Sequence, residues 1–581
     1  MLDYLIKGAT VVDGTGAAGF VADVGIADGR IIVIGKVTDN ATEVIDATGL
    51  VLCPGFVDPH THYDAQLFWD PMATPSSLHG VTSIIAGNCG FTLAPVSGNG
   101  ADYLIDMMAR VEGMPKVALQ QGVPWNWATF ADYLGRLDGN LGVNAAFLVG
   151  HCALRREVMG DDAVGHEATA DQVAEMRVLL AAALDAGGMG FSTTQSFTHS
   201  DGDGQPVPSR WATPDELLAL CDEVGAHPGT TLEWVTDGCL SGFNDTEIDL
   251  MIDMSLRADR PINWNVLTVD SAVPERSTDQ LAAGAEAERR GARVVALTMP
   301  TLVGMNMSFL TYCALNQLPD WGAILSLPVD ERMVELADPE VRIFMENRAN
   351  APEAGVFGRL TGWGRYRIGD TFSAANAGLK GRLVADIARE RGVREFFALL
   401  DIVAADDLRT VLWPGPTDDD AESWRMRVDA WRSGYAMLGG SDAGAHLDRM
   451  CGAPYTTEFL GDCLRGKQLI GLEEAIHHLT DMPARLFGLR DRGQLAEGWI
   501  ADLVLFDPDA IDSGPVMMVN DLPGGSGRLS AEAIGVEKVF VNGRLSVDGN
   551  VPTGVLAGSV LKSGRDTDTV TAGAQRGHEE R

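Results

Sequence analysis

Two histidines in the first part of the chain carry the strongest chemical signal. His60 and His62 lie in the segment PGFVDPHTHYD, directly after a short apolar run. On an extended chain, residues two positions apart point to the same side, so both imidazoles can bind one metal ion. An isolated His-x-His pair is usually incidental. The position of this pair at the end of an apolar strand therefore favours a metal site.

A cysteine and an aspartate occupy similar positions after two further apolar segments. Cys89 lies in SIIAGNCGFTLAP, and Asp442 lies in LGGSDAGAHLD. A thiolate at a strand end can ligate or bridge a metal, and a buried structural thiol is the alternative. A carboxylate has two oxygens, so Asp442 can ligate a metal and also accept a proton from water. Together with the histidine pair, these residues form the pattern of a metallohydrolase.

The segments that precede these residues are expected to be parallel strands. Short apolar runs alternate with helical stretches such as residues 171–186 and 214–224, which is typical of βα units. Eight such runs predict an α/β protein with a (β/α)8 TIM-like barrel, whose chemistry lies at the carboxyl ends of its strands. The expected strands are Gly55–His62, Val81–Cys89, Asn144–His151, Gly190–Ser192, Thr230–Trp234, Pro261–Val266, Arg293–Leu297 and Ala436–Asp442.

The two ends of the chain differ from this middle part. β-branched runs bounded by Asp-Gly and Thr-Gly steps predict hairpins in ADVGIADGRIIVIG, and the same texture returns in VEKVFVNGRLSVDG. We therefore expect residues 1–55 and 490–560 to form one small β domain beside a barrel of residues 56–489. The polar tail of residues 563–581 is expected to be disordered.

The interval between the last two expected strands is too long for one crossover helix. An inserted subdomain is therefore expected at about residues 299–435. Its large apolar side chains would either fill the core of the insertion itself or cover the mouth of the barrel. These side chains are Met305, Met307, Phe309, Trp321, Phe357, Trp363 and Tyr366.

Composition and charge limit the classes of partner. Of the 581 residues, 46% are hydrophobic and 22% are charged, which is typical of a globular chain. The formal net charge of -37, from 44 Lys+Arg against 81 Asp+Glu, repels phosphate backbones and anionic membrane surfaces. No apolar run is long enough to cross a bilayer, and the N-terminus has no basic signal region. We expect a cytoplasmic protein with reduced cysteines and with no nucleic-acid or membrane partner.

Four segments together resemble a known family. HTH at residues 60–62, GNCG around Cys89, GGSD at 439–442 and GQLAEGWIADLVLFDP near the C-terminus look like the amidohydrolase superfamily, in particular its N-acyl-D-amino-acid deacylase branch. The resemblance extends over most of the chain. It implies a metal-dependent barrel flanked by a β-sandwich, and hydrolysis of an amide by metal-activated water. It also implies that Cys89 takes the place of the carboxylated lysine that bridges two metals in many relatives.

The sequence departs from this branch after the fifth and sixth strands. The resemblance implies one histidine at each place, and both would bind a second metal. Here GTTLEWVTDG has Glu233 at the first place, and RPINWNVLTVD has Trp264 and Asn265 around the second. Glu233 could act as an oxygen ligand, or hydrogen-bond the attacking water or a substrate amine. The structural alternative is a glutamate paired with a basic neighbour.

Four other polar residues are candidates for substrate binding. His151 closes the third expected strand, and His446 lies in the loop after the eighth. Arg155 and Arg210 are the arginines best placed to bind a substrate carboxylate through a bidentate contact.

The sequence predicts a zinc-dependent hydrolase of a small-molecule amide, most directly an N-acyl-D-amino acid. Zinc at His60, His62 and Asp442, with Cys89 near or bound, would lower the pKa of water and polarise the scissile carbonyl. Asp442 would take the proton and pass it to the departing amine, and Glu233 would assist. One firmly bound zinc is expected, with a second ion weak or absent.

Two alternatives stay open. A cyclic amide or lactone hydrolase would use the same attack by water, and a binding protein would have lost catalysis together with the two histidines. Retention of His60, His62 and Asp442 argues against the binding protein, because binding alone does not need that triad. The acyl group, the preference for D or L substrates and the oligomeric state are left open, and a homo-oligomer is compatible with the sequence.

Overall fold

The computed structural model describes residues 1–98 and 100–573, which separate into two compact units. The larger unit contains residues 1–301 and the described residues from 424 onward, and the smaller contains residues 302–423. Within the described part of the chain, no helix is long and apolar enough to cross a membrane. His60, Cys89 and Asp442 all belong to the larger unit.

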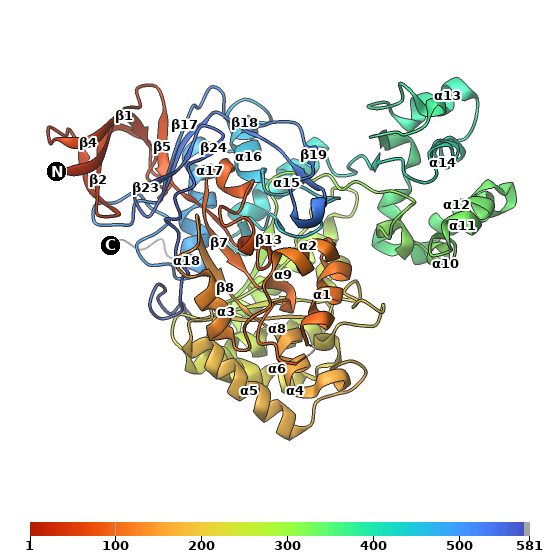
Figure 1. Cartoon of the computed structure of the whole chain (residues 1–581), viewed down its shortest axis with the longest axis horizontal. Coiled ribbons are helices and arrows are strands. Elements are labelled where there is room, and N and C mark those ends of the chain that lie inside the picture. The colour runs from red at the N-terminus through yellow and green to blue at the C-terminus, as the bar shows by residue number, and fades with distance from the viewer. Residues whose placement is uncertain (99, 574–581) are drawn as a thin grey trace. The chain divides into compact units, whose positions relative to one another are not determined.

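Both ends of the chain contribute to one nine-stranded sheet (Figure 1). Its order is β24-β23-β22-β17-β5-β1-β2-β3, with β4 paired to β1. The turns at Asp28-Gly29 and Asn542-Gly543 have positive φ at both residues, the type I′ geometry that these pairs favour. The strands are β1 Leu2–Val11, β2 Phe20–Ala27, β3 Arg30–Gly35, β4 Ala41–Asp46, β5 Val51–Pro54, β17 Leu503–Phe506, β22 Val536–Val541, β23 Arg544–Asp548 and β24 Val551–Pro552.

This terminal sheet differs from the expected sandwich in how its two halves meet. β17 pairs antiparallel with β5 along one edge and with β22 along the other. The C-terminal strands therefore extend the N-terminal sheet sideways by hydrogen bonding. The four short strands outside this sheet in the same part of the chain are β18 Asp512–Ser513, β19 Met517–Val519, β20 Arg528–Ser530 and β21 Ala533–Ile534.

Each of the eight segments predicted for the middle of the chain overlaps at least one strand. These strands pair in parallel in the orders β6-β7-β8 and β9-β10-β11-β12-β13-β16. Their apolar side chains form a common buried cluster that includes Val57, Ile85, Val295 and Leu297. The strands are β6 Phe56–Asp58, β7 Val81–Ala86, β8 Asn144–Phe147, β9 Val149–Gly150, β10 Gly190–Thr194, β11 Thr231–Val235, β12 Ile262–Trp264, β13 Val294–Thr298 and β16 Ala436–Leu438.

The parallel strands form two sheets that meet at their ends, and not one closed sheet. Between β8 and β9 the pairing changes from β7 to β10. At the other junction, β6 pairs with β7 and β16 pairs with β13, and the described residues show no ladder between β6 and β16. Their following loops meet instead through a parallel bridge between Thr61 and Ala443.

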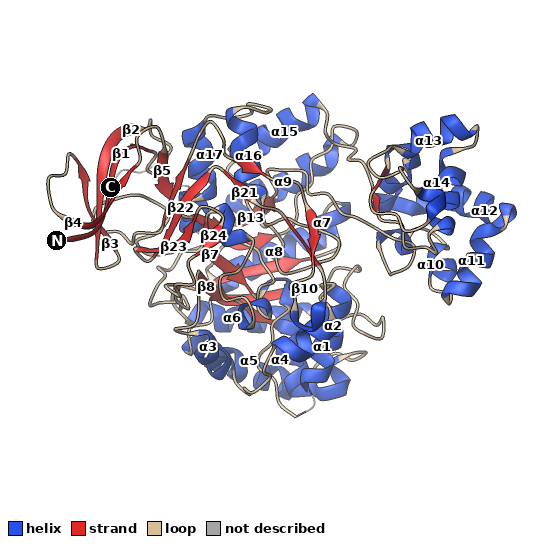
Figure 2. Ribbon diagram, turned by 45° about the horizontal axis from the view of Figure 1, so that its top comes forward, coloured by secondary structure: helices blue, strands red, loops and turns tan. Residues whose placement is uncertain are grey.

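Helices follow the parallel strands and pack around them (Figure 2). The predicted stretches 171–186 and 214–224 correspond to α5 and α6, which pack side by side, as do α6 and α8. The helices of this unit are α1 Gly100–Val111, α2 Lys116–Gly122, α3 Phe130–Leu137, α4 His151–Met159, α5 Ala170–Asp185, α6 Pro214–Ala226, α7 Gly238–Ser241, α8 Asp245–Ala258, α9 Pro274–Arg289, α15 Ala421–Arg432, α16 Tyr455–Leu464, α17 Leu472–Leu479 and α18 Asp481–Leu486.

The smaller unit is mainly helical and has its own core. Trp321 and Trp363 stack with ring centroids 5.5 Å apart, and both belong to one buried apolar cluster with Met307, Phe309 and Tyr366. These side chains therefore fill the core of the insertion, one of the two roles expected for them. The elements are α10 Trp321–Leu325, α11 Val329–Ala337, α12 Pro339–Ala349, α13 Val384–Arg391, α14 Glu395–Ala405, β14 Arg367–Ile368 and β15 Leu412–Trp413.

The C-terminal segment expected to be disordered is ordered as far as it is described. Thr567 Oγ1 donates to the Gly229 carbonyl (2.7 Å), and the Asp568 N–H donates to the Gly488 carbonyl (2.7 Å). Its polar side chains thus satisfy backbone groups of neighbouring loops, a role that composition alone does not reveal. Residues 574–581 lie outside the described residues.

Candidate metal centre

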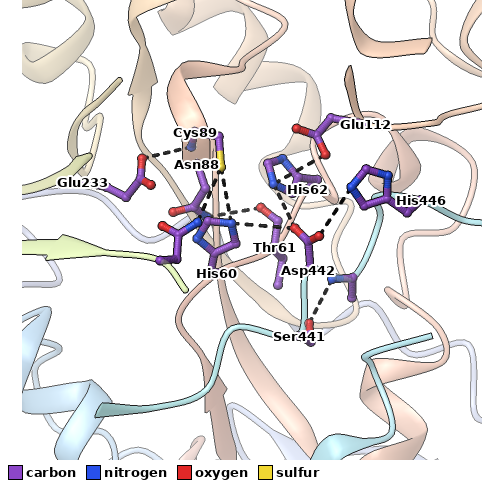
Figure 3. A network of polar contacts seen from close by, with 12 residues as sticks. His60, Thr61, His62, Asn88, Cys89, Glu112, Glu233, Ser441, Asp442 and His446 are labelled. Carbon is purple, nitrogen blue, oxygen red and sulfur yellow. Dashed lines mark hydrogen bonds and ion pairs between the residues drawn. The ribbon is translucent and has the colours of Figure 1, made fainter. Parts of the chain in front are cut away.

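His60 and His62 lie in the loop that follows β6. The backbone of this loop is fixed to the loop after β16, because the Asp442 N–H donates to the His60 carbonyl (3.1 Å) and the His62 N–H donates to the Ala443 carbonyl (2.7 Å). The two rings lie 5.2 Å apart with 74° between their planes. Both Nε2 atoms face Asp442, so the histidine pair points to one place (Figure 3).

Asp442 directs its two carboxylate oxygens to different groups. Oδ1 lies 3.2 Å from His62 Nε2 and 3.7 Å from His60 Nε2, whereas Oδ2 lies 3.8 Å from His446 Nε2. Burial acts to raise the pKa of Asp442, but the hydrogen bond with His62 and the nearby imidazoles outweigh it and lower the pKa. The lowered pKa means that this carboxylate is ionised. Its side chain is 28% exposed, so a small molecule can reach it.

Cys89 lies beside His60 on a turn after β7. Its φ of +56° is in the left-handed region, and its Sγ lies 3.6 Å from His60 Nε2. Its backbone N–H donates to Glu233 Oε2 (2.9 Å), and Asn265 Nδ2 lies 3.7 Å from the sulfur. Burial, with the charges of Glu233 and Glu112, raises the pKa of the Cys89 thiol well above its ordinary value. Metal binding to this sulfur must therefore release a proton.

A further acid, Glu112, belongs to the same group and was missed in the sequence. Its Oε2 lies 3.8 Å from His62 Nε2, and its side chain is 4% exposed. The residue follows α1, and its carbonyl accepts the His446 N–H (2.5 Å). The only local signal is one acid among apolar residues in RVEGMP, a pattern too common to identify a ligand.

The group has more acidic side chains than charged imidazoles. Burial and His62 lower the pKa of His60 to about 3, so that ring is neutral. Burial acts to lower the pKa of His62, but Glu112 and Asp442 raise it to about 10. Burial raises the pKa of Glu112, although the charge of His62 opposes this shift. One charged imidazole thus faces the ionised Asp442 and the buried carboxyl of Glu112. Imidazole, carboxylate and thiolate donors are those that zinc prefers, and a divalent cation would balance the charge, so these residues fit a metal.

Glu233 and Asn265 stand at the places where the resemblance implies histidines. Glu233, on β11, has a backbone amide and not a basic side chain as its hydrogen-bond partner, and burial raises its pKa to about 8. Glu233 Oε1 and Asn265 Oδ1 are buried and have no hydrogen-bond partner among the described residues. Trp264 packs edge-to-face on Phe243 with centroids 4.9 Å apart, which is a packing role.

His151 and Arg155 have an internal partner, which corrects their prediction as substrate-binding residues. His151 Nδ1 lies 2.9 Å from Thr193 Oγ1, and its Nε2 lies 2.8 Å from Glu216 Oε1. Arg155 Nη1 donates to both Glu216 oxygens (2.6 and 2.5 Å), and Nη2 donates to the His166 carbonyl (2.7 Å). Glu216, on α6, neutralises the guanidinium and occupies the imidazole, so these groups are not available to a ligand.

Arg210 and His446 have less complete internal partners. His446 is 29% exposed beside Asp442. Arg210 Nη1 donates to the carbonyl of His199 (3.2 Å), in the loop after β10. His199 Nδ1 lies 2.7 Å from Thr194 Oγ1, and burial and the nearby histidines lower the pKa of His199 to about 3. This loop therefore brings Arg210 into the electrostatic environment of the group.

Comparison with known proteins extends over nearly the whole chain. The model of the amidohydrolase family matches residues 43–547. D-aminoacylase of Alcaligenes xylosoxydans xylosoxydans is 28% identical over 563 residues, which cover 96% of this chain and 97% of that protein.

Solved structures show the same likeness. A crystal structure of D-aminoacylase, described as defining a novel subset of amidohydrolases, has a TM-score of 0.64 at 28% identity and covers 97% of this chain and 100% of that chain. An N-acyl-D-glutamate deacylase from Bordetella bronchiseptica, complexed with zinc and a phosphonate mimic of the tetrahedral intermediate, has a TM-score of 0.63 at 25% identity, with coverage of 97% and 100%.

Proposed function

Because the chain belongs to the amidohydrolase family, we propose that it is a zinc-dependent deacylase that hydrolyses the amide bond of N-acyl-D-amino acids. The likeness to D-aminoacylase over 96% of the chain supports the substrate class. The convergence of His60, His62 and Asp442 supports the use of a metal. In this proposal the parallel strands act as a (β/α)8-type barrel, whose ring is completed by the bridge between Thr61 and Ala443.

Three side chains would hold the ion, with a fourth beside them. His60 and His62 offer Nε2 and Asp442 offers Oδ1, while Cys89 Sγ lies 3.6 Å from the same Nε2 of His60. Zinc bound there supplies Lewis acidity, which lowers the pKa of water and polarises the amide carbonyl. We propose one firmly held ion, because amide and carboxyl groups occupy the two places where imidazoles would complete a second position.

In the proposed mechanism the two oxygens of Asp442 have different roles, one as metal ligand and one as proton acceptor. Oδ1 faces the histidine pair, and Oδ2 lies on the side of His446. Oδ2 can therefore accept a proton from the attacking water and then deliver it to the nitrogen of the departing amine. His446 Nε2, 3.8 Å from Oδ2, can orient the carboxylate or the substrate during this transfer. Glu233, whose Oε2 accepts the Cys89 N–H and whose Oε1 has no partner among the described residues, is proposed to assist by hydrogen-bonding the water or the substrate amine.

Arg210 is proposed to bind the carboxylate of the amino-acid part. Its Nη1 is fixed by backbone carbonyls of the loop after β10, and in the described chain its Nε and Nη2 have no hydrogen-bond partner. These two nitrogens can form a bidentate contact with a planar carboxylate.

An assay on a matched set of substrates tests the function. The zinc-loaded protein is incubated with N-acetyl-D- and N-acetyl-L-amino acids, a cyclic amide and a lactone, and the free amino acid or ring-opened product is measured. We expect release of the D-amino acid, loss of turnover after chelation and recovery on adding zinc. Ring opening alone would favour the cyclic amide or lactone hydrolase. No turnover of any substrate by zinc-loaded protein would favour the binding protein.

A further inference from the structure

Two groups of ligand-type side chains share His62. One consists of His60, His62 and Cys89, and the other of His62, Glu112 and Asp442. Within each group the candidate ligand atoms lie within 4.8 Å of one another. Figure 3 shows Cys89 and Glu112 on different sides of His62. The two groups therefore offer an ion two different surroundings, one with a sulfur donor and one rich in oxygen.

Distances within the oxygen-rich group are those of neighbouring ligands around one ion. In a tetrahedral zinc site with bonds of about 2.0–2.3 Å, adjacent ligand atoms lie roughly 3.3–3.7 Å apart. His62 Nε2 lies 3.2 Å from Asp442 Oδ1 and 3.8 Å from Glu112 Oε2. His60 Nε2 lies 3.7 Å from the same Asp442 oxygen. These three contacts link the four side chains through His62 Nε2 and Asp442 Oδ1.

The carboxyl group of Glu112 has few contacts that would explain its burial. Among the described residues, this side chain has no hydrogen-bond partner and its one ion-pair contact is His62. The main chain around it is fixed, because its carbonyl accepts the His446 N–H. Gly113 follows with φ +59°, and a Cβ there would lie 3.3 Å from His446 Nδ1, so the turn that presents Glu112 requires glycine.

The other side of His62 is arranged differently. Cys89 donates its backbone N–H to Glu233, and its sulfur already has the Asn265 amide 3.7 Å away. The sulfur therefore has the Asn265 amide as its neighbour, and the nearby Glu233 carboxyl is bound to the Cys89 backbone. The side of Glu112, in contrast, offers the carboxyl groups of Glu112 and Asp442. A divalent cation on that side can bind two carboxyl oxygens together with an imidazole, and its own charge favours the ionised form of both acids.

We propose that Glu112 is a ligand of the zinc ion, completing with His60, His62 and Asp442 a site of two imidazoles and two carboxylates. This inference rests on the proposed metal-dependent function and adds a ligand to it. The loop after α1 thus supplies a donor in a chain that lacks the two histidines after β11 and β12. The ion lies on the side of Asp442, where the proton acceptor is exposed, and Cys89 is not needed to retain it.

Zinc affinity of three single variants tests the assignment. Glu112→Gln removes the proposed donor, Glu233→Gln makes the same change at an equally buried glutamate beside Cys89, and Cys89→Ser removes the sulfur. Zinc dissociation constants are measured by competition with a chromophoric chelator, and cobalt-substituted samples are compared by visible absorption. We expect Glu112→Gln to weaken zinc binding at least roughly tenfold and to change the cobalt spectrum. The other two variants should stay within about threefold of the parent.

Equal affinity and an unchanged cobalt spectrum in Glu112→Gln would overturn the proposal, as would a larger loss in Cys89→Ser than in Glu112→Gln. If Glu112→Gln does not fold, Glu112→Asp keeps the charge on a shorter arm and should weaken zinc binding by at least threefold. Unchanged affinity in that variant would also overturn the assignment. These measurements need no substrate. Failure of the parent protein to hydrolyse N-acyl-D-amino acids would therefore count against the proposed function and leave the ligand assignment standing.

Discussion

Two buried polar clusters lie in the larger unit, and their charges are balanced in opposite ways. In the first, Arg155, His151 and Glu216 are almost fully buried, and their contacts measure 2.5–2.8 Å. In the second, His62, Asp442 and Glu112 are separated by 3.2–3.8 Å. Hydrogen bonds within the first cluster satisfy its charged groups. In the second cluster, the side chains are of the types that bind metals, and their spacing leaves room for an ion between them.

The difference teaches how a structural cluster can be distinguished from a functional one. Arg155 and Glu216 cancel each other, and a neutral His151 adds a hydrogen bond, so the first cluster needs no ligand. The carboxylates of Glu112 and Asp442 outnumber the one charged imidazole of the second. Because uncompensated buried charge is costly, the second cluster is stable only with a further cation or with protons bound in its place.

Removal of both histidines should have the largest effect. The double variant His60→Ala/His62→Ala loses both imidazole donors, so we expect no retained zinc and no measurable turnover, with the fold intact by circular dichroism. His227→Ala is the control, since His227 contacts Asp185 (3.3 Å) far along the chain from these ligands and should keep both properties. Turnover at the parent rate in metal-free double variant would remove the histidines from the mechanism.

Loss of Glu216 should destabilise the protein without removing the metal. Glu216→Gln leaves the Arg155 guanidinium buried without its counter-charge, which costs about 3–5 kcal/mol of unfolding free energy. Urea denaturation measures this loss, and elemental analysis should find the parent zinc content. Glu223→Gln breaks a contact with the partly exposed Arg177 and should cost less than about 1 kcal/mol. Zinc loss in Glu216→Gln at equal stability would make the first cluster part of the site.

Neutralising Asp442 should slow hydrolysis more than it affects folding. Asp442→Asn keeps the shape of the side chain but cannot accept a proton, so kcat/KM should fall on the order of a hundredfold or more, about 2.7 kcal/mol. Asp448→Asn, in the same loop, is the matched control. With chemistry rate-limiting, a decrease of less than about threefold would assign the base to another residue.

Lowering the pH should reduce the contribution of the first cluster to the unfolding free energy. This is the smallest of the four predicted effects. Burial acts to raise the pKa of Glu216, but the hydrogen bond from His151 and the charge of Arg155 outweigh it and hold that pKa below its ordinary value of 4.5. A lowered carboxyl pKa contributes stability above 4.5, and this contribution is lost as the pH falls through the folded-state pKa. The difference in unfolding free energy between the parent and Glu216→Gln should therefore shrink below about pH 4.5. A constant difference from pH 7 to pH 3 would contradict an ionised Glu216.

The order of the parallel strands was predictable, but their ends were not. Each predicted strand overlaps an observed one, because buried apolar runs between helical stretches are a local pattern. The first and eighth predicted strands end at His62 and Asp442, whereas β6 ends at Asp58 and β16 ends at Leu438. Asp442 has φ +57°, which a strand does not allow, and this conformation depends on contacts with the neighbouring loop.

Sequence alone determined which side chains could bind a metal at the end of β6, because the i, i+2 spacing of His60 and His62 depends only on adjacent backbone. Tertiary structure decided which distant residues join them. Glu112 belongs to the site because the loop after α1 places its carboxyl next to His62. Arg155 does not, because its guanidinium is paired with Glu216 on α6. Charge compensation acts through space over a few ångströms, so the role of an acid or a base depends on the distance to its nearest opposite charge and not on its place in the chain.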